Sequence, residues 1–293
     1  MDAFHWMHND KSVAASKYVC GMNLFDKISE TAAFLQTKGF EGADLGIVLG
    51  TGLGKLLERV EDQFAIDYHD IPHFPLSTVE FHAGRLIIGT LAGRRVILMQ
   101  GRFHAYEGYS MEVVAFPIRV LQRLGIQHLF LSGAAGAMNL DWRKGDLMML
   151  SDHINLQPSN PLIGPNDERL GPRFLDMSAA YDAETRQHFR TAARGSDTTL
   201  HEGIYVSVPG SMLETAAEYR FLRTIGADAV GMSTVPEVIA ARHGGMRVSA
   251  IVVLTDECDP DNLQPIDIPE LLAVASSAEE KLIDLLLQAI PAL

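Results

Sequence analysis

The sequence alternates between short apolar runs rich in β-branched residues and longer stretches in which apolar residues recur at helical spacing. This alternation is typical of an α/β fold built on one central sheet. The pattern predicts strands over residues 45–49, 85–91, 95–99, 127–131, 147–150, 203–208 and 247–254. It predicts helices over residues 25–36, 111–124, 178–193, 214–224, 235–241 and 268–289.

Two segments depart from the common pattern. Residues 246–254 read MRVSAIVVL, an almost continuous apolar run, which predicts a central strand covered on both faces. Residues 155–176 have no clear period and contain several prolines and glycines. Because a loop of this length inside a compact domain usually has a function, we expect an active-site or interface loop here.

One domain is predicted for residues 24–293, because no linker, charge block or low-complexity tract divides them. Residues 1–23 form an N-terminal extension, which we expect to be loosely ordered. It lacks a basic region followed by an apolar stretch, so no secretory signal is predicted.

Charge and composition exclude several classes of partner. The formal net charge of −13 repels polyphosphate backbones and argues against nucleic acid. No apolar run reaches about 18 residues, so no membrane contact is expected. The two cysteines, Cys20 and Cys258, are too few for a disulfide framework and have no metal-ligand spacing around them. A reducing, cytoplasmic location fits this composition.

The sequence GTGLG, residues 50–54, follows the first predicted strand. Its glycines let a ligand approach backbone N–H groups, and Thr51 adds a hydroxyl, which together suit an oxyanion. A plain turn is the alternative. Lys55 stands where a dinucleotide fingerprint needs its third glycine, and the run lacks the GK[ST] of a P-loop.

The sequence QGRFHAYEG, residues 100–108, follows a second strand. Arg102 offers a fork of donors for phosphate oxygens, and His104 and Tyr106 alternate with their neighbours and so can face one cavity. The alternative is a solvated loop in which Glu107 pairs with Arg102. His82, before another strand, is either a ligand contact or a surface histidine.

Three further segments place small or polar residues near predicted strand or helix ends. SGAAGAMN, residues 132–139, leaves room for a ligand at the end of a strand, although helix packing also favours small residues. Glu214 and Ser233 precede helical runs, where each is either a ligand contact or a helix cap. Thr255 and Asp256 end the long apolar strand, a common position for functional side chains.

Together these segments resemble the trimeric purine nucleoside phosphorylases from about Asp44 to the C-terminal helix. GRFHAYEG, DHINL at residues 152–156, NPLIGPNDER at 160–169 and GADAVGMSTVPEVIAARH at 226–243 follow that family in its own order. The resemblance implies a single domain with a central mixed β-sheet surrounded by α-helices, and a homotrimer. It implies phosphorolysis of purine nucleosides with phosphate as co-substrate and with no metal or organic cofactor.

The resemblance also assigns residues to the site. It implies phosphate contacts from Thr51, His82, Arg102, His104, Ala134 and Ser233. It implies nucleoside contacts from Tyr106, Ala134, Ala135, Gly136, Leu213, Glu214, Val230, Gly231, Met232, Thr255 and Asp256, with His104, Glu214 and Asp256 as catalytic residues. Leu170 takes the place of an aromatic residue that reaches a neighbouring subunit, and Ile268 that of a histidine near the 5′-hydroxyl.

Asp256 departs from the family, in which most members have Asn at this position. An ionised carboxylate cannot donate to a 6-oxo group, whereas a protonated Asp256 can. Glu214 favours 6-oxopurines, so inosine and guanosine are the predicted substrates. The alternatives are a methylthioadenosine or adenosine phosphorylase, which uses Asp at the base site, and a non-catalytic purine or phosphate sensor on the same fold.

Overall fold

The structure is a computed structural model that describes residues 22–50, 54–78 and 83–293. Within these ranges the strands are β1 (Leu45–Leu49), β2 (Glu61–Asp67), β3 (Arg85–Leu91), β4 (Arg94–Gln100), β5 (His128–Ala137), β6 (Leu147–Asn155), β7 (Leu200–Ser207), β8 (Ala229–Gly231) and β9 (Arg247–Glu257). The α-helices are α1 (Leu24–Thr37), α2 (Met111–Arg123), α3 (Ala183–Arg194), α4 (Ala216–Thr224), α5 (Val235–His243) and α6 (Ile268–Ala289).

The described strands form one mixed sheet in the order β2-β3-β4-β1-β5-β8-β7-β6-β9. Strands β4, β1, β5 and β9 run parallel, whereas β2–β3, β3–β4, β5–β8 and β6–β9 are antiparallel pairs. Because β9 also pairs with β5, the strands β5, β8, β7, β6 and β9 close on themselves. The expected mixed sheet surrounded by helices is confirmed.

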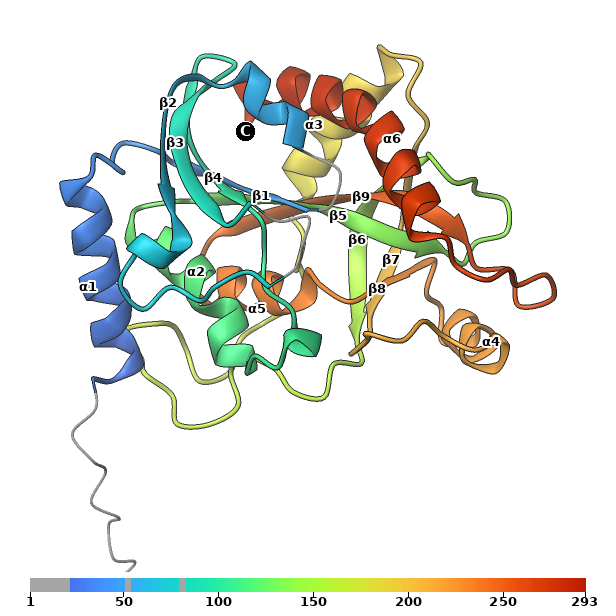
Figure 1. Ribbon diagram of the computed structural model, residues 1–293, viewed down its shortest axis with the longest axis horizontal. Coiled ribbons are helices and arrows are strands. Elements are labelled where there is room, and N and C mark those ends of the chain that lie inside the picture. The colour runs from blue at the N-terminus through green and yellow to red at the C-terminus, as the bar shows by residue number, and fades with distance from the viewer. Residues whose placement is uncertain (1–21, 51–53, 79–82) are drawn as a thin grey trace, which may run out of the picture.

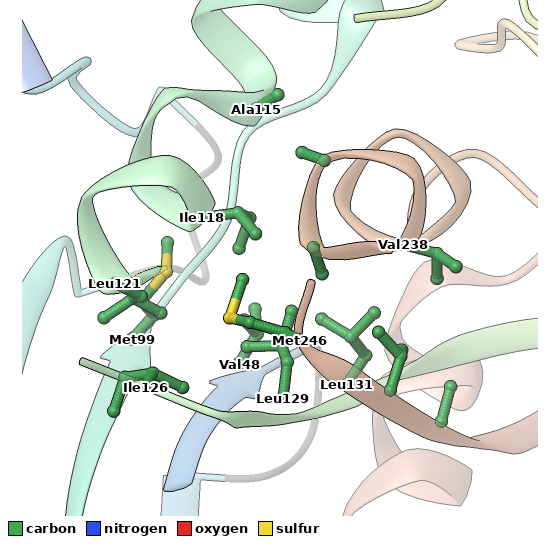
Figure 2. Packing of buried hydrophobic residues seen from close by; sticks show 14 of the residues in the cluster. Val48, Met99, Ala115, Ile118, Leu121, Ile126, Leu129, Leu131, Val238 and Met246 are labelled. Atoms are coloured by element: carbon green, nitrogen blue, oxygen red, sulfur yellow. The ribbon is translucent and has the colours of Figure 1, made fainter. Parts of the chain in front are cut away.

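Helices cover both faces of the sheet (Figure 1). Helices α1, α2 and α5 lie on one face, and α3 and α6 lie on the other. Strand β1 shows why both faces are apolar, because Val48 packs toward α2 and α5 while Ile47 packs toward α6. Figure 2 shows part of the core on the α2 and α5 side of the sheet, which includes Ile118 of α2, Val238 of α5, and Val48 and Leu131 of the sheet.

The long apolar strand β9 is central, as its sequence predicts. It pairs with β5 on one side and β6 on the other. Val252 faces one core and Val253 the other. Each face of this strand is therefore covered. Near the end of the strand, Thr255 and Asp256 reach the edge of the sheet where the parallel strands end.

Several predicted boundaries differ for local reasons. Strand β5 continues through the small residues to Ala137, beyond the predicted end at 131, because β9 pairs with it along that length. Helix α3 begins at Ala183 and not at 178, since the Asp182 side chain caps it through the Thr185 N–H. Strand β2 was not predicted; its side chains are largely exposed and it lacks an apolar signal.

The predicted loop at 155–176 contains no helix or strand after Asn155, where β6 ends. The predicted extension lies outside the described residues except for Met22 and Asn23, and the side chain of Asn23 caps α1. Among the described residues, no helix has both the length and the apolar character that a membrane crossing needs.

Candidate active site

A cavity of about 420 Å³ opens where β4, β5, β8 and β9 end. The segment after β4 supplies Arg102, His104 and Tyr106, and β9 supplies Thr255 and Asp256. A second cavity of about 330 Å³ adjoins the first and shares Glu214 and Asp256 with it. The carboxyl edge of the parallel strands therefore carries the polar side chains, as expected for a ligand crevice in an α/β sheet.

Arg102 is fixed in the wall of the cavity by a buried ion pair. Its Nε donates to Oε1 of Glu237 on α5 at 3.1 Å, and its Nη2 donates to Oε2 at 2.6 Å. Its Nη1 donates to the Ser132 carbonyl at 2.5 Å. Arg102 is only 2% exposed, so the solvated loop arginine considered from sequence is excluded. The guanidinium is a preoriented fork of donors.

Glu107 holds His104 and not Arg102. Its Oε1 accepts hydrogen bonds from the His104 backbone N–H at 2.8 Å and from the ring Nδ1 at 2.9 Å. Its Oε2 accepts from the Thr78 backbone N–H and hydroxyl. Burial alone raises the Glu107 pKa, but the hydrogen bonds from His104 and Thr78 outweigh it and lower the pKa to about 2. The ring of His104 also stacks on Tyr106, with centroids 4.6 Å apart.

Ser233 reaches the cavity from a strained turn. Thr234 has φ 69° and ψ −56°, and the Val235 N–H donates to the Ser233 carbonyl at 2.7 Å, which makes a γ-turn. Thr234 is the N-cap residue of α5 and makes no side-chain cap bond, so Ser233 is not the cap. A Cβ on Gly133 would lie 3.0 Å from Nη1 of Arg102 and 3.9 Å from Oγ of Ser233. The backbone of Gly133, the guanidinium of Arg102 and the hydroxyl of Ser233 thus lie close together in the wall of the cavity.

Asp256 accepts two side-chain hydrogen bonds at the other end of the cavity. The Thr255 hydroxyl lies 2.9 Å from Oδ1, and the Cys258 thiol donates to Oδ2 at 3.2 Å. A Cβ on Gly136 would come within 2.4 Å of the Cys258 sulfur and 3.0 Å of Oδ2. Only glycine at position 136 leaves room for this arrangement.

Glu214 faces the same end of the cavity and does not cap a helix. Helix α4 is capped by Thr215 and Glu218, which bond reciprocally in a capping box. Burial raises the pKa of Glu214, and the negative charges of Glu218 and Asp256 add to the rise. A role for Glu214 as a helix cap is therefore excluded. Its half-buried carboxyl lines the cavity.

The structure brings most of the predicted site residues into this one cavity. They come from five segments of the chain: Arg102, His104, Tyr106, Ala134, Ala135, Gly136, Leu213, Glu214, Val230, Gly231, Met232, Ser233, Thr255 and Asp256. Ile268, predicted near the 5′-hydroxyl, lines it too. Thr51 and His82 lie outside the described residues. Gly50, just before Thr51, donates its N–H to the Ser132 hydroxyl at 3.1 Å.

Leu170 does not take the predicted position. It is 8% exposed and packs in the larger core of its own chain, so its side chain is not presented to a neighbouring subunit. Sequence reasoning also missed Glu237, Tyr219 and Cys258. A signal existed for Glu237, the acidic residue in the otherwise apolar run VPEVIAA, because a buried carboxylate needs a cation.

Known proteins are similar to this chain in both sequence and fold. The model of the Phosphorylase superfamily matches residues 44–291. Purine nucleoside phosphorylase 1 of Bacillus subtilis is 48% identical over 254 residues, which are 87% of this chain and 94% of that protein. The mouse purine nucleoside phosphorylase is 44% identical over 277 residues, which are 91% of this chain and 96% of the mouse protein. The chain belongs to the purine nucleoside phosphorylase family.

Solved structures of purine nucleoside phosphorylases have the same fold as this chain. A Schistosoma purine nucleoside phosphorylase in complex with hypoxanthine has a TM-score of 0.88 at 39% identity, covering 93% of this chain and 99% of that one. The Schistosoma mansoni enzyme in complex with adenosine has a TM-score of 0.86 at 40% identity, with 91% of this chain and 96% of that chain covered. Members of this family are pentosyltransferases, so the cavity is the candidate site of a glycosyl transfer.

Proposed function

We propose that this chain catalyses the reversible phosphorolysis of purine ribonucleosides and deoxyribonucleosides to the free base and pentose 1-phosphate. The observation that carries the proposal is one cavity with two chemically different ends. Arg102, Gly133 and Ser233 converge at one end, and the carboxyls of Glu214 and Asp256 face the other. A phosphate suits the first end and a purine with polar edges suits the second.

The phosphate end supplies charge stabilisation. Cleavage of the N-glycosidic bond builds positive charge on the ribose, and phosphate oxygens beside it stabilise that charge before one of them bonds to the anomeric carbon. Arg102 is already oriented by Glu237, and His104 by Glu107. We assign Thr51 and His82 to the same phosphate from the family resemblance. No metal or organic cofactor takes part in the proposed reaction.

The base end stabilises the leaving group. Negative charge develops on the purine as the bond breaks, and a hydrogen-bond donor at N7 lowers its energy. Asp256 is the residue we assign to N7, and Glu214 is assigned to N1–H and the 2-amino group of a 6-oxopurine. Tyr106 and Met232 are assigned to the ribose between the two ends. Inosine and guanosine are therefore the proposed substrates.

We further propose a homotrimer located in the cytoplasm. Because Leu170 is buried, the contact with a neighbouring subunit falls to other side chains of the segment after β6. Ile163 is 69% exposed there and Phe174 is 89% exposed, which is unusual for apolar side chains without a partner. Light scattering should give three times the mass of the 32.1 kDa chain, and a Phe174→Ser variant should dissociate more readily. A monomeric mass for the unmodified protein would reject the trimer.

The deciding experiment is base release from inosine, guanosine, adenosine and methylthioadenosine by purified protein, with and without phosphate. We expect release from inosine and guanosine only when phosphate is present. Release without phosphate would indicate a hydrolase, and binding without any turnover would indicate a sensor. Preferential turnover of methylthioadenosine would move the chain to the alternative phosphorylase class.

A further inference from the structure

Gln157 connects three segments that meet beside the cavity. It stands just after β6, which ends at Asn155, and is only 9% exposed. Its side-chain Nε2 donates to the Ser207 hydroxyl at 2.9 Å and to the Val208 carbonyl at 2.6 Å, and it lies 3.4 Å from the Met232 carbonyl. The segment after β6 is thereby joined to the end of β7 and to the residues that follow β8.

The surrounding oxygens fix the orientation of the Gln157 amide. The carbonyls of Val208 and Met232 can only accept hydrogen bonds, so the N–H groups of the amide must face them. The Ser207 hydroxyl accepts from Gln157 and donates its own hydrogen to the Ser233 carbonyl at 3.1 Å. Gln157 and Ser207 therefore form two successive hydrogen bonds that end on the backbone of Ser233.

The backbone of Ser233 is held at both its carbonyl and its N–H by side chains of β7. The carbonyl accepts from the Ser207 hydroxyl, and the N–H donates to the Tyr205 hydroxyl at 3.3 Å. Tyr205 and Ser207 are fully buried. Gln157, Tyr205 and Ser207 are not among the described residues that line the cavity of about 420 Å³, whereas Ser233 is. These three side chains thus support Ser233 from outside the ligand space.

Ser233 needs this support because the turn that follows it is strained. Thr234 has φ 69°, a value that a β-branched residue rarely adopts and that persists only where neighbouring contacts hold it. The Ser233 carbonyl also accepts from the Val235 N–H that closes this turn. Because a serine hydroxyl is one rotatable bond from its backbone, bonds to the Ser233 backbone help to determine where the hydroxyl lies, close to Arg102 and Gly133.

We propose that Gln157 is a positioning residue of the phosphate end, which acts through Ser207 to hold the Ser233 hydroxyl within reach of a bound phosphate. This inference rests on the proposed function, in which Ser233 contacts phosphate. Gln157 does not touch the reacting atoms, and its role is to stabilise one arrangement of the Ser233 backbone. The segment 155–176, for which an active-site or interface function is expected, thereby contributes to the active site of its own chain.

The first test separates the donors of Gln157 from its shape. Gln157→Leu removes the amide at similar size, and the KM for phosphate should rise about 3–10-fold, the size expected for one lost hydrogen bond. Gln157→Glu keeps the shape but sets an oxygen against two carbonyls, and it should raise this KM at least as much. The dissociation constant of hypoxanthine, assigned to the base end, should change less than about twofold. An unchanged phosphate KM in either variant overturns the proposal, as does an equal loss of hypoxanthine binding.

A double-mutant cycle tests whether Gln157 acts through Ser233. Ser233→Ala removes the hydroxyl, so adding Gln157→Leu to it should raise the phosphate KM no further than about twofold. Two effects that multiply in full would overturn the proposal, because Gln157 would then act by another route. Gln187→Leu, at an exposed position of α3, is the matched control and should change neither constant. If Gln157→Leu does not fold, Ser207→Ala removes the middle hydroxyl and should give the same result.

A binding measurement separates failure of this inference from failure of the proposed function. Calorimetry with inorganic phosphate alone reports its affinity without any turnover. Phosphate should bind the Gln157→Leu variant more weakly than the unmodified protein by the same factor as the change in KM. Equal phosphate affinities overturn the inference even if the protein is an active phosphorylase. Weaker phosphate binding by the variant, together with no turnover of any nucleoside by the unmodified protein, rejects the proposed reaction and supports the role of Gln157.

Discussion

The two ends of the cavity hold their polar groups in different ways. At the phosphate end, Arg102 and His104 are each fixed by a carboxylate behind them, Glu237 and Glu107 respectively. At the base end, the carboxyls themselves face the ligand space, and Asp256 accepts hydrogen bonds from the neutral groups of Thr255 and Cys258. A permanent anion needs fixed donors, whereas a purine presents both donors and acceptors along its edge.

This difference predicts that phosphate binding is lost when a buried charge loses its partner, and that purine binding is lost when the shape of the base end changes. Buried charges depend strongly on their partners, because a lone charge in the interior cannot regain its hydration. Loss of one hydrogen bond from a neutral hydroxyl or thiol costs less free energy of unfolding. The predictions below begin with the phosphate end.

The largest expected effect is that of Glu237→Ala. It leaves the guanidinium of Arg102 buried without the carboxylate of Glu237, which should cost about 3–5 kcal/mol of unfolding free energy. Chemical denaturation measures the loss, and the KM for phosphate should rise because Arg102 loses its orientation. Asp261→Ala is the control, since the Arg220–Asp261 pair has side chains that are 55% and 81% exposed and should contribute little. Equal effects of the two changes would contradict the assignment.

The next effect tests the base end. In Gly136→Ala, the new Cβ would lie 2.4 Å from the Cys258 sulfur and 3.0 Å from Oδ2 of Asp256, so both groups must move. Overpacking of this kind costs about 1–3 kcal/mol. We expect kcat/KM for inosine to fall while the KM for phosphate changes little.

A matched control and a rescue sharpen that result. Gly54→Ala adds the same methyl group where no atom lies within 4 Å, and it should leave stability unchanged. Combining Gly136→Ala with Cys258→Ala removes the clashing sulfur and should restore part of the lost stability. A double variant as unstable as the sum of its parts would show that the two residues do not contact each other.

Much of the fold follows from local sequence signals, as β9 and α2 illustrate. The apolar run at 246–254 predicts a central strand, and the helical period of residues 111–124 predicts α2, which ends at Arg123. Strand β2 was not predicted because most of its side chains are exposed and its pairing with β3 is decided by tertiary structure. Leu170 was misplaced for a related reason, since burial within its own chain cannot be read from its position in a motif.

The sequence predicted the ligand-facing residues that stand in motifs at strand ends. It did not predict the residues that support them from the side away from the ligand. Arg102, Glu214 and Asp256 stand in segments whose order resembles the family. Glu237, in contrast, binds Arg102 across 135 positions of the chain, and Tyr219 of α4 lies in the same buried cluster as Cys258, just after β9. Such partners depend on how α4 and α5 pack against the sheet, which no local pattern specifies.

The smallest expected effect concerns the acid stability supplied by Glu107. Its pKa in the folded protein is about 2, below the ordinary value of 4.5, so its stabilising hydrogen bonds are fully present above pH 4.5 and are lost as the pH falls toward 2. Glu107→Gln cannot ionise and should be less stable than the unmodified protein at neutral pH by about 1–2 kcal/mol. The difference should shrink between pH 4.5 and 2. Unfolding curves at several pH values measure it, and a difference that stays constant down to pH 2 would show that the ionised carboxylate does not hold His104.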